Sequence, residues 1–100
     1  MWRMIRFTLL PTGNAIAFPD DDAGERIDEI ETAFARAAGF QRERSWSTPL
    51  EEIRLLSGRP GSVLLRWDGY ATDIVAAQGS AVCLSDLAAA LDRDESFIRA

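Results

Sequence analysis

The sequence predicts an α+β fold: one domain over residues 1–100, with a four- to five-stranded, mostly antiparallel sheet and two to three helices on one face. Several short segments alternate apolar and polar residues, a pattern typical of half-buried strands. One longer segment repeats apolar residues at helical spacing, which indicates an amphipathic helix. Turn sequences separate these segments, so the expected order is β-β-α-β-α-β-β-α.

A hairpin is expected at the N-terminus. Residues 3–9 alternate between two faces, and the sequence PTGN at residues 11–14 is rich in residue types that favour turns. Residues 15–18 would then return as the second strand. This N-terminus is basic and apolar, but Arg3 and Arg6 interrupt its apolar run, so we expect a strand rather than a secretion signal.

The first helix is predicted after Pro19. Its apolar residues, at spacings of four, three, four and three, are Ala23, Ile27, Ile30, Phe34 and Ala37. One of the three consecutive aspartates at residues 20–22 is expected to cap the free backbone amides. Gly39 is expected to end the helix in a left-handed conformation, and Phe40 to pack back on its last turn.

The sequence FQRERSW then alternates as a strand, in which Phe40, Arg42, Arg44 and Trp46 share one face. Neither face is cleanly apolar. We therefore expect either a strand at an edge of the sheet or an extended surface segment.

A short second helix is predicted from Thr48 to Leu56. The sequence TPLE supplies a hydroxyl cap, a proline at the first helical position and a carboxylate three residues after the cap. Leu50, Ile53 and Leu56 would face inward, and Gly58 would end the helix.

A second hairpin is predicted over residues 62–76, with Asp68 and Gly69 as a two-residue loop. Its residues expected to face one core are Val63, Leu65, Trp67, Tyr70, Thr72 and Ile74.

The C-terminal part is expected to be a helix capped by Ser85. Leu87, Leu91 and Ile98 would lie near one face of this helix. Residues 82–84 are expected to form a last short strand or an extended approach to the helix.

The composition excludes several chemistries. The chain has no histidine and no lysine, all eleven basic residues being arginine, so imidazole bases, imidazole metal ligands and Schiff-base lysines are absent. The single cysteine, Cys83, excludes an internal disulfide and a cysteine-based zinc site, and its apolar neighbours predict a small buried side chain. We expect no enzyme and no cofactor.

Cell context and charge narrow the class of partner. One cysteine fits a reducing compartment, and the exclusive use of arginine suits a GC-rich genome, so a cytoplasmic bacterial protein is expected. The net charge of −5 argues against general binding to nucleic acid or anionic membranes. No apolar run reaches the about 18 residues that a membrane helix needs.

The acidic stretch FPDDDAGERIDEIE, at residues 18–31, invites comparison with a calcium loop. With Asp20 at the first loop position several ligand positions agree, but the obligatory glycine position falls on Glu25. Apolar residues at helical spacing also begin at Ala23, so part of the same stretch is expected to form a helix rather than a calcium-binding loop. We therefore expect no metal.

The leading hypothesis concerns the surplus of acid in this stretch. A cap and the helix dipole account for one or two carboxylates, and the rest form either a solvated helix face or a surface for a basic partner. The candidate partner-binding residues are Asp21, Asp22, Glu25, Asp28 and Glu29. The chain is then a small acidic, non-enzymatic binding or regulatory protein that acts through a protein–protein interface, and resembles immunity proteins or inhibitors only in size and charge.

Two alternatives stay open. A small-ligand or nucleotide-binding domain would use the Arg/Trp patch of Arg42, Arg44, Trp46 and Arg66. A homodimer would instead form through the strand from Phe40 to Trp46. The same arginines could also pair with carboxylates of this chain.

Overall fold

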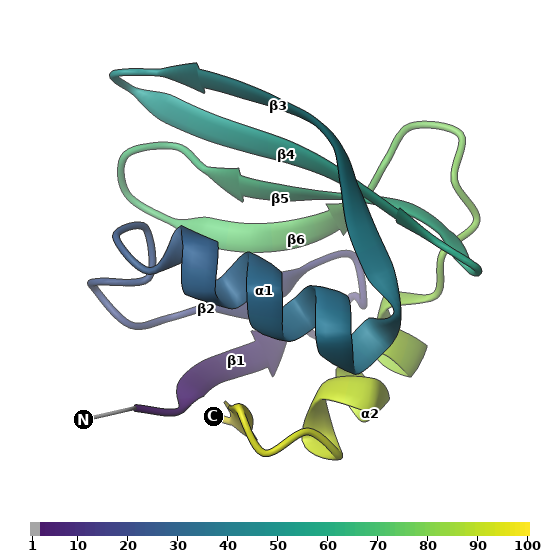
Figure 1. The fold of residues 1–100 in the computed structure, drawn as a ribbon. Coiled ribbons are helices and arrows are strands. Elements are labelled where there is room, and N and C mark those ends of the chain that lie inside the picture. Colours follow the sequence, from purple (N-terminus) through teal and green to yellow (C-terminus); the bar gives the residue numbers. More distant parts are fainter. Residues whose placement is uncertain (1–2) are drawn as a thin grey trace.

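The computed structural model describes residues 3–100. The elements, shown in Figure 1, are β1 Ile5–Leu9, β2 Ile16–Phe18, α1 Ile27–Ala38, β3 Phe40–Thr48, β4 Glu51–Gly58, β5 Gly61–Trp67, β6 Thr72–Ala76, α2 Leu84–Asp92 and β7 Phe97–Arg99.

The strands form one seven-stranded sheet in the order β3-β4-β5-β6-β2-β1-β7. All neighbouring strands are antiparallel except β1 and β7, which are parallel, so the sheet is mixed. The prediction of four to five strands with two to three helices is therefore wrong, because the described residues form seven strands and only two helices. The coarser α+β class holds.

One error lies at the predicted helix from Thr48 to Leu56, which is a turn followed by β4. The Thr48 hydroxyl does accept hydrogen bonds from the backbone amides of Leu50 and Glu51, at 3.2 and 3.1 Å. The turn it closes joins two strands instead of starting a helix. Since β4 pairs with β3 on one side and β5 on the other, sheet pairing outweighs the local helix signal.

The second error lies at the C-terminus. Helix α2 has Cys83 at its N-cap without a side-chain cap, so the predicted Ser85 cap is wrong, and Cys83 is exposed rather than buried. The chain then forms β7, and Ile98 in this strand is 47% exposed. The prediction that Ile98 lies on a helix face with Leu87 and Leu91 is therefore wrong. A three-residue strand carries too little periodicity to be recognised before its neighbour, β1, is known.

Both predicted hairpins are confirmed, since β1 pairs with β2 and β5 with β6. The second loop is longer than expected: Trp67 pairs with Thr72, and the Asp68 carboxylate accepts bonds from the amides of Tyr70 and Ala71 at 3.0 and 2.8 Å. Tyr70 is consequently 96% exposed, so its predicted place in the core is wrong.

The end of α1 also agrees with its prediction. Gly39 has a φ of 74° and donates its amide to the carbonyl of Ala35 at 2.9 Å. The ring of Phe40 lies 5.2 Å from that of Phe34, back on the helix.

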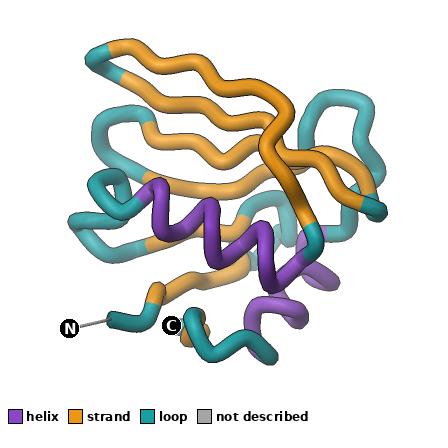
Figure 2. Tube along the Cα trace, viewed as in Figure 1, coloured by secondary structure: helices purple, strands orange, loops and turns teal. Residues whose placement is uncertain are grey.

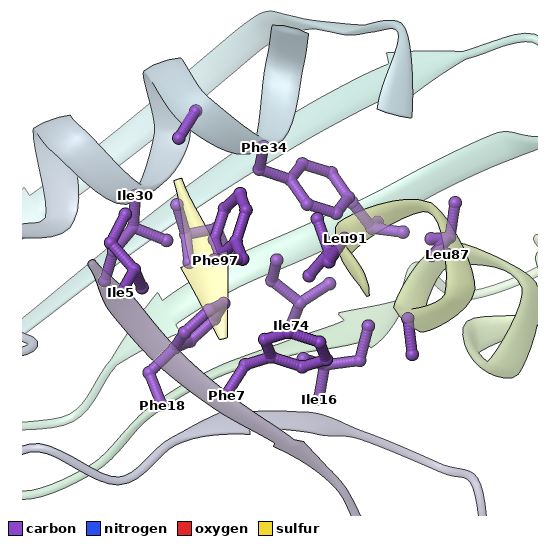
Figure 3. Packing of buried hydrophobic residues seen from close by; sticks show 14 of the residues in the cluster. Ile5, Phe7, Ile16, Phe18, Ile30, Phe34, Ile74, Leu87, Leu91 and Phe97 are labelled. Atoms are coloured by element: carbon purple, nitrogen blue, oxygen red, sulfur yellow. The ribbon is translucent and has the colours of Figure 1, made fainter. Parts of the chain in front are cut away.

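Helices and strands form two layers, visible as purple and orange in Figure 2. Between them lies one core, in which Ile30 and Phe34 of α1 meet Leu91 of α2 and the inward side chains of the sheet (Figure 3). Phe7 and Phe97 pack edge to face at 6.0 Å across the parallel strands. Each such buried side chain contributes about 1.5–3 kcal/mol to stability. Neither described helix has the length and apolar composition needed to cross a membrane.

Candidate functional site

The acidic stretch forms a series of turns before α1 begins. The amide of Ala23 bonds the carbonyl of Asp20 at 3.0 Å, and that of Arg26 bonds the carbonyl of Ala23 at 3.1 Å. Arg26 is the N-cap residue, and no side chain caps the helix, so the predicted aspartate cap is wrong. We call residues 20–26 the acidic turn.

Two of its aspartates contact arginines near the N-terminus. Arg6 donates to Asp20 at 2.9 Å, and Arg3 forms an ion pair with Asp22. The hydrogen bond and charge of Arg3 lower the pKa of Asp22. These carboxylates attach the acidic turn to β1 and to the residues just before it, which explains why they do not cap the helix.

The carboxylates of α1 are engaged as well. Glu31 accepts hydrogen bonds from Arg42 at 2.8 Å and from Arg54 at 2.9 Å, and Asp28 lies 2.7 Å from Arg54. Arg54 is only 7% exposed. Burial by itself lowers the pKa of Arg54, but the hydrogen bonds and charges of Asp28 and Glu31 outweigh it and raise that pKa. We call these four residues the helix network. Sequence reasoning did not assign Arg54 a role.

Of the predicted partner-binding residues, Asp22, Asp28 and Glu29 thus have ion-pair partners within the chain, since Glu29 pairs with Arg26 at 3.0 Å. Among the ion pairs formed by residues 3–100, none includes Asp21 or Glu25. Their exposed carboxylates therefore contribute uncompensated negative charge.

The predicted arginine patch is divided by a β-bulge in β3. Arg42 pairs with Leu56 on the helix-covered face, whereas Arg44 pairs with Leu55 on the opposite face, with Glu43 as the extra residue. The expectation that Arg42, Arg44 and Trp46 share a face is therefore wrong. One inserted residue shifts the alternation of the strand.

The remaining arginines of the patch have partners too. Arg66 donates two hydrogen bonds to the carboxylate of Asp73, both at 2.9 Å, and these bonds raise the pKa of Arg66. The Arg44 guanidinium lies 5.0 Å from the centre of the Trp46 ring. The ligand-binding role of these residues stays a prediction.

A cavity of about 200 Å³ lies beside Arg66. Its lining residues are Glu51, Ile53, Arg66, Trp67, Asp68, Ala71 and Asp73. The carboxylates outnumber the guanidinium, and backbone hydrogen bonds from Ala71 and Tyr70 lower the pKa of Asp68, so the lining is negative at neutral pH. An anionic ligand would be repelled there.

The tips of two hairpins form a second hollow, of about 520 Å³. Its residues are Pro49, Leu50, Trp67, Asp68, Gly69 and Tyr70, and we call them the tip surface. Leu50 is 78% exposed and Tyr70 96% exposed. Gly69 adopts a φ of 95°, which favours glycine, and a Cβ there would lie 3.4 Å from the carbonyl oxygen of Leu50, so the two tips are adjacent.

Trp67 joins the tip surface to the acidic turn. A Cβ placed on Gly24 would overlap the indole of Trp67, so the acidic turn packs directly against this ring. The same Trp67 lines the hollow together with Leu50 and Tyr70. The two hairpin tips and the loop before α1 lie at the same end of the fold in Figure 1.

Sequence reasoning missed the tip surface. A signal was present, because Leu50 lies inside a turn sequence and Tyr70 directly follows Asp68–Gly69, and apolar side chains inside turns are candidates for exposure. Among residues 3–100, no group of three or more carboxylate or cysteine side chains is arranged to hold a metal ion.

Fold and surface together define a small α+β protein with helices on one face of a mixed sheet and an acidic, partly apolar end. No family model matches the chain, and neither a curated protein nor a solved structure matches it.

Proposed function

We propose that this chain is a small non-enzymatic binding or regulatory protein that contacts a protein partner with a basic surface. The contact region is the acidic turn together with the tip surface. The observation that carries the proposal is the packing of Gly24 on Trp67, which brings carboxylates without ion-pair partners in the described chain next to exposed apolar side chains.

The chemistry of this end suits a protein partner. Tyr70 offers an aromatic anchor of the kind that supplies much of the binding energy at interfaces, and the exposed Leu50 adds apolar contact area beside it. Asp21, Glu25 and Glu51 are exposed and would attract basic side chains at the rim. Charge complementarity of this kind mainly speeds association and selects the partner.

Affinity purification from the source cells, with quantitative mass spectrometry, tests the proposal. The chain is used as bait in three forms: unaltered, with Leu50→Ser and Tyr70→Ser, and with Asp21→Asn and Glu25→Gln. A protein with a basic surface should be recovered by the first bait and depleted about tenfold or more with the other two.

The matched control is the pair Asp86→Asn and Glu95→Gln. These exposed carboxylates lie in and after α2, and removing them makes the same change in net charge. The control bait should recover the partner as well as the unaltered chain. Equal recovery by all baits would refute the contact region.

Association kinetics with the purified partner then test the electrostatic part. The variant with Asp21→Asn and Glu25→Gln should associate more slowly, and its rate should depend less on salt, because fewer unscreened charges steer the encounter. An unchanged rate would show that the acidic turn does not take part.

The proposal places the protein in the cytoplasm of a bacterium. Its support is the single cysteine and the exclusive use of arginine among basic residues. Subcellular fractionation checks the location.

A further inference from the structure

Strand β3 is an edge strand along its whole length. It lies at the end of the sheet order and pairs only with β4, from Phe40 opposite Gly58 to Thr48 opposite Glu51. All side chains from Gln41 to Thr48 are exposed. Along the other side of β3, the described chain supplies no strand, so this edge can pair with a further strand.

The features that normally protect an edge are confined to one half of β3. The charged residues Arg42, Glu43 and Arg44 and the bulge all lie in the first half. The second half, from Ser45 to Thr48, is uncharged, and it carries Trp46 with 43% of its surface exposed. A regular, uncharged edge segment with an exposed aromatic ring is suited to strand pairing.

We propose that two copies of this chain pair through residues 44–48 of β3, antiparallel and about a two-fold axis at Trp46. The sheet of one copy then continues into that of the other. The inference does not rest on the proposed function, because the tip surface belongs to the hairpin ends and not to the free edge of β3.

Symmetry selects the register. A two-fold axis that pairs two identical edges antiparallel runs perpendicular to the sheet, so residues at equal distances from the axis oppose each other on the same face. With the axis at Trp46, Arg44 opposes Thr48, Ser45 opposes Ser47, and Trp46 opposes its copy. The whole regular segment between the bulge and the turn is then used.

Neighbouring registers are less favourable. An axis at Arg44 places two guanidinium groups opposite each other, and an axis at Glu43 does the same with two carboxylates. An axis at Ser45 brings the bulged Glu43 into the new ladder. Trp46 also pairs with Ile53 on the sheet face opposite the helices, so a second Trp46 would add to this apolar pair.

Disulfide trapping tests the register. In a Cys83→Ser background, Trp46→Cys places two cysteines directly opposite, with Cα atoms about 4.5–5.5 Å apart, which suits a disulfide. We expect most of this variant to become a covalent dimer under mild oxidation. Arg44→Cys in the same background is the control, because its two copies would lie about 13 Å apart along the strand. Adding Thr48→Cys to Arg44→Cys should restore the cross-link.

A charge exchange tests whether the partner is a second copy. Trp46→Lys and Trp46→Glu should each weaken self-association by about tenfold or more, because like charges then oppose each other at the axis. An equimolar mixture of the two variants should regain the dimer, seen by sedimentation equilibrium. The variant with Leu50→Ser and Tyr70→Ser should dimerise like the unaltered chain, which separates this inference from the proposed function.

Three results would overturn the inference. One is an unaltered chain that stays monomeric up to about 1 mM. Another is a dimer in which Trp46→Cys cross-links no better than Arg44→Cys. The last is a monomeric chain that binds a different protein and no longer binds it when Trp46 is changed. This result would assign the edge of β3 to that protein.

Discussion

Glu31 and Glu51 use the same functional group in opposite ways. The side chain of Glu31 is 15% exposed and lies between the guanidinium groups of Arg42 and Arg54. Glu51 is exposed beside Leu50 and belongs to no ion pair of the part of the chain described here. The first carboxylate connects a helix to the sheet, whereas the second contributes to the charge of the surface.

This difference shows that the number of acidic residues in a segment does not measure its binding surface. Within the acidic stretch, Asp20, Asp22 and Glu31 are neutralised by arginines that lie far away in the sequence. Within the stretch, Asp21 and Glu25 belong to no ion pair of the described residues, and outside it the same holds for Glu51, which adjoins Leu50. These three carboxylates lie near the tip surface, while the helix network serves the stability of the fold.

The largest expected effect is in the helix network. Arg54→Leu leaves the half-buried Glu31 with one guanidinium fewer and should lower the free energy of unfolding by roughly 3 kcal/mol. Urea denaturation measures this loss. The double variant with Glu31→Leu should lose less than the sum of the single losses, because the two residues act together. A loss below about 0.5 kcal/mol would show that Arg54 contributes little.

A smaller effect is expected where the two regions meet. Gly24→Ala forces the Trp67 ring to move and should cost about 1–2 kcal/mol. Tryptophan fluorescence should shift, since the environment of Trp67 changes. The neighbouring exposed Glu25→Ala serves as control, and an equal cost in both variants would contradict the packing of the acidic turn on Trp67.

Acid should weaken the ion pairs near the C-terminus. The hydrogen bonds from Arg99 and Arg36 lower the pKa values of Asp92 and Asp94 below the ordinary 3.8. A lowered folded-state pKa means that the stabilisation is present above about pH 4 and is lost as the pH falls through the folded-state value. The free energy of unfolding, measured by denaturation at about pH 6 and at about pH 3, should therefore fall less in the variant with Asp92→Asn and Asp94→Asn than in the unaltered chain. The same loss in both proteins would contradict this assignment.

The smallest effect on stability is expected at the tip surface. Leu50→Ser and Tyr70→Ser remove exposed side chains and should change the free energy of unfolding by no more than about 0.5 kcal/mol, while partner capture is lost. A loss of folding stability comparable to that of Arg54→Leu would show that these residues are structural.

The sequence by itself determined the elements with strong local signals. The turn residues near Gly13 and at Asp68–Gly69 predicted both hairpins, and apolar spacing with Gly39 predicted the body and the end of α1. The mixed character of Phe40 to Trp46 predicted an edge strand or an extended surface segment, and the structure has the edge strand β3. These features depend on neighbours a few residues away, so their physics is contained in short segments.

Only the tertiary structure decided the rest, because each choice depends on residues distant in sequence. The Thr48 hydroxyl suits a helix start and a hairpin turn equally, and pairing with β3 and β5 selected the turn. Strand β7 exists because β1 offers it a parallel neighbour. Arg3, Arg6 and the helix network selected which carboxylates are neutralised, since an ion pair forms only where folding brings opposite charges together.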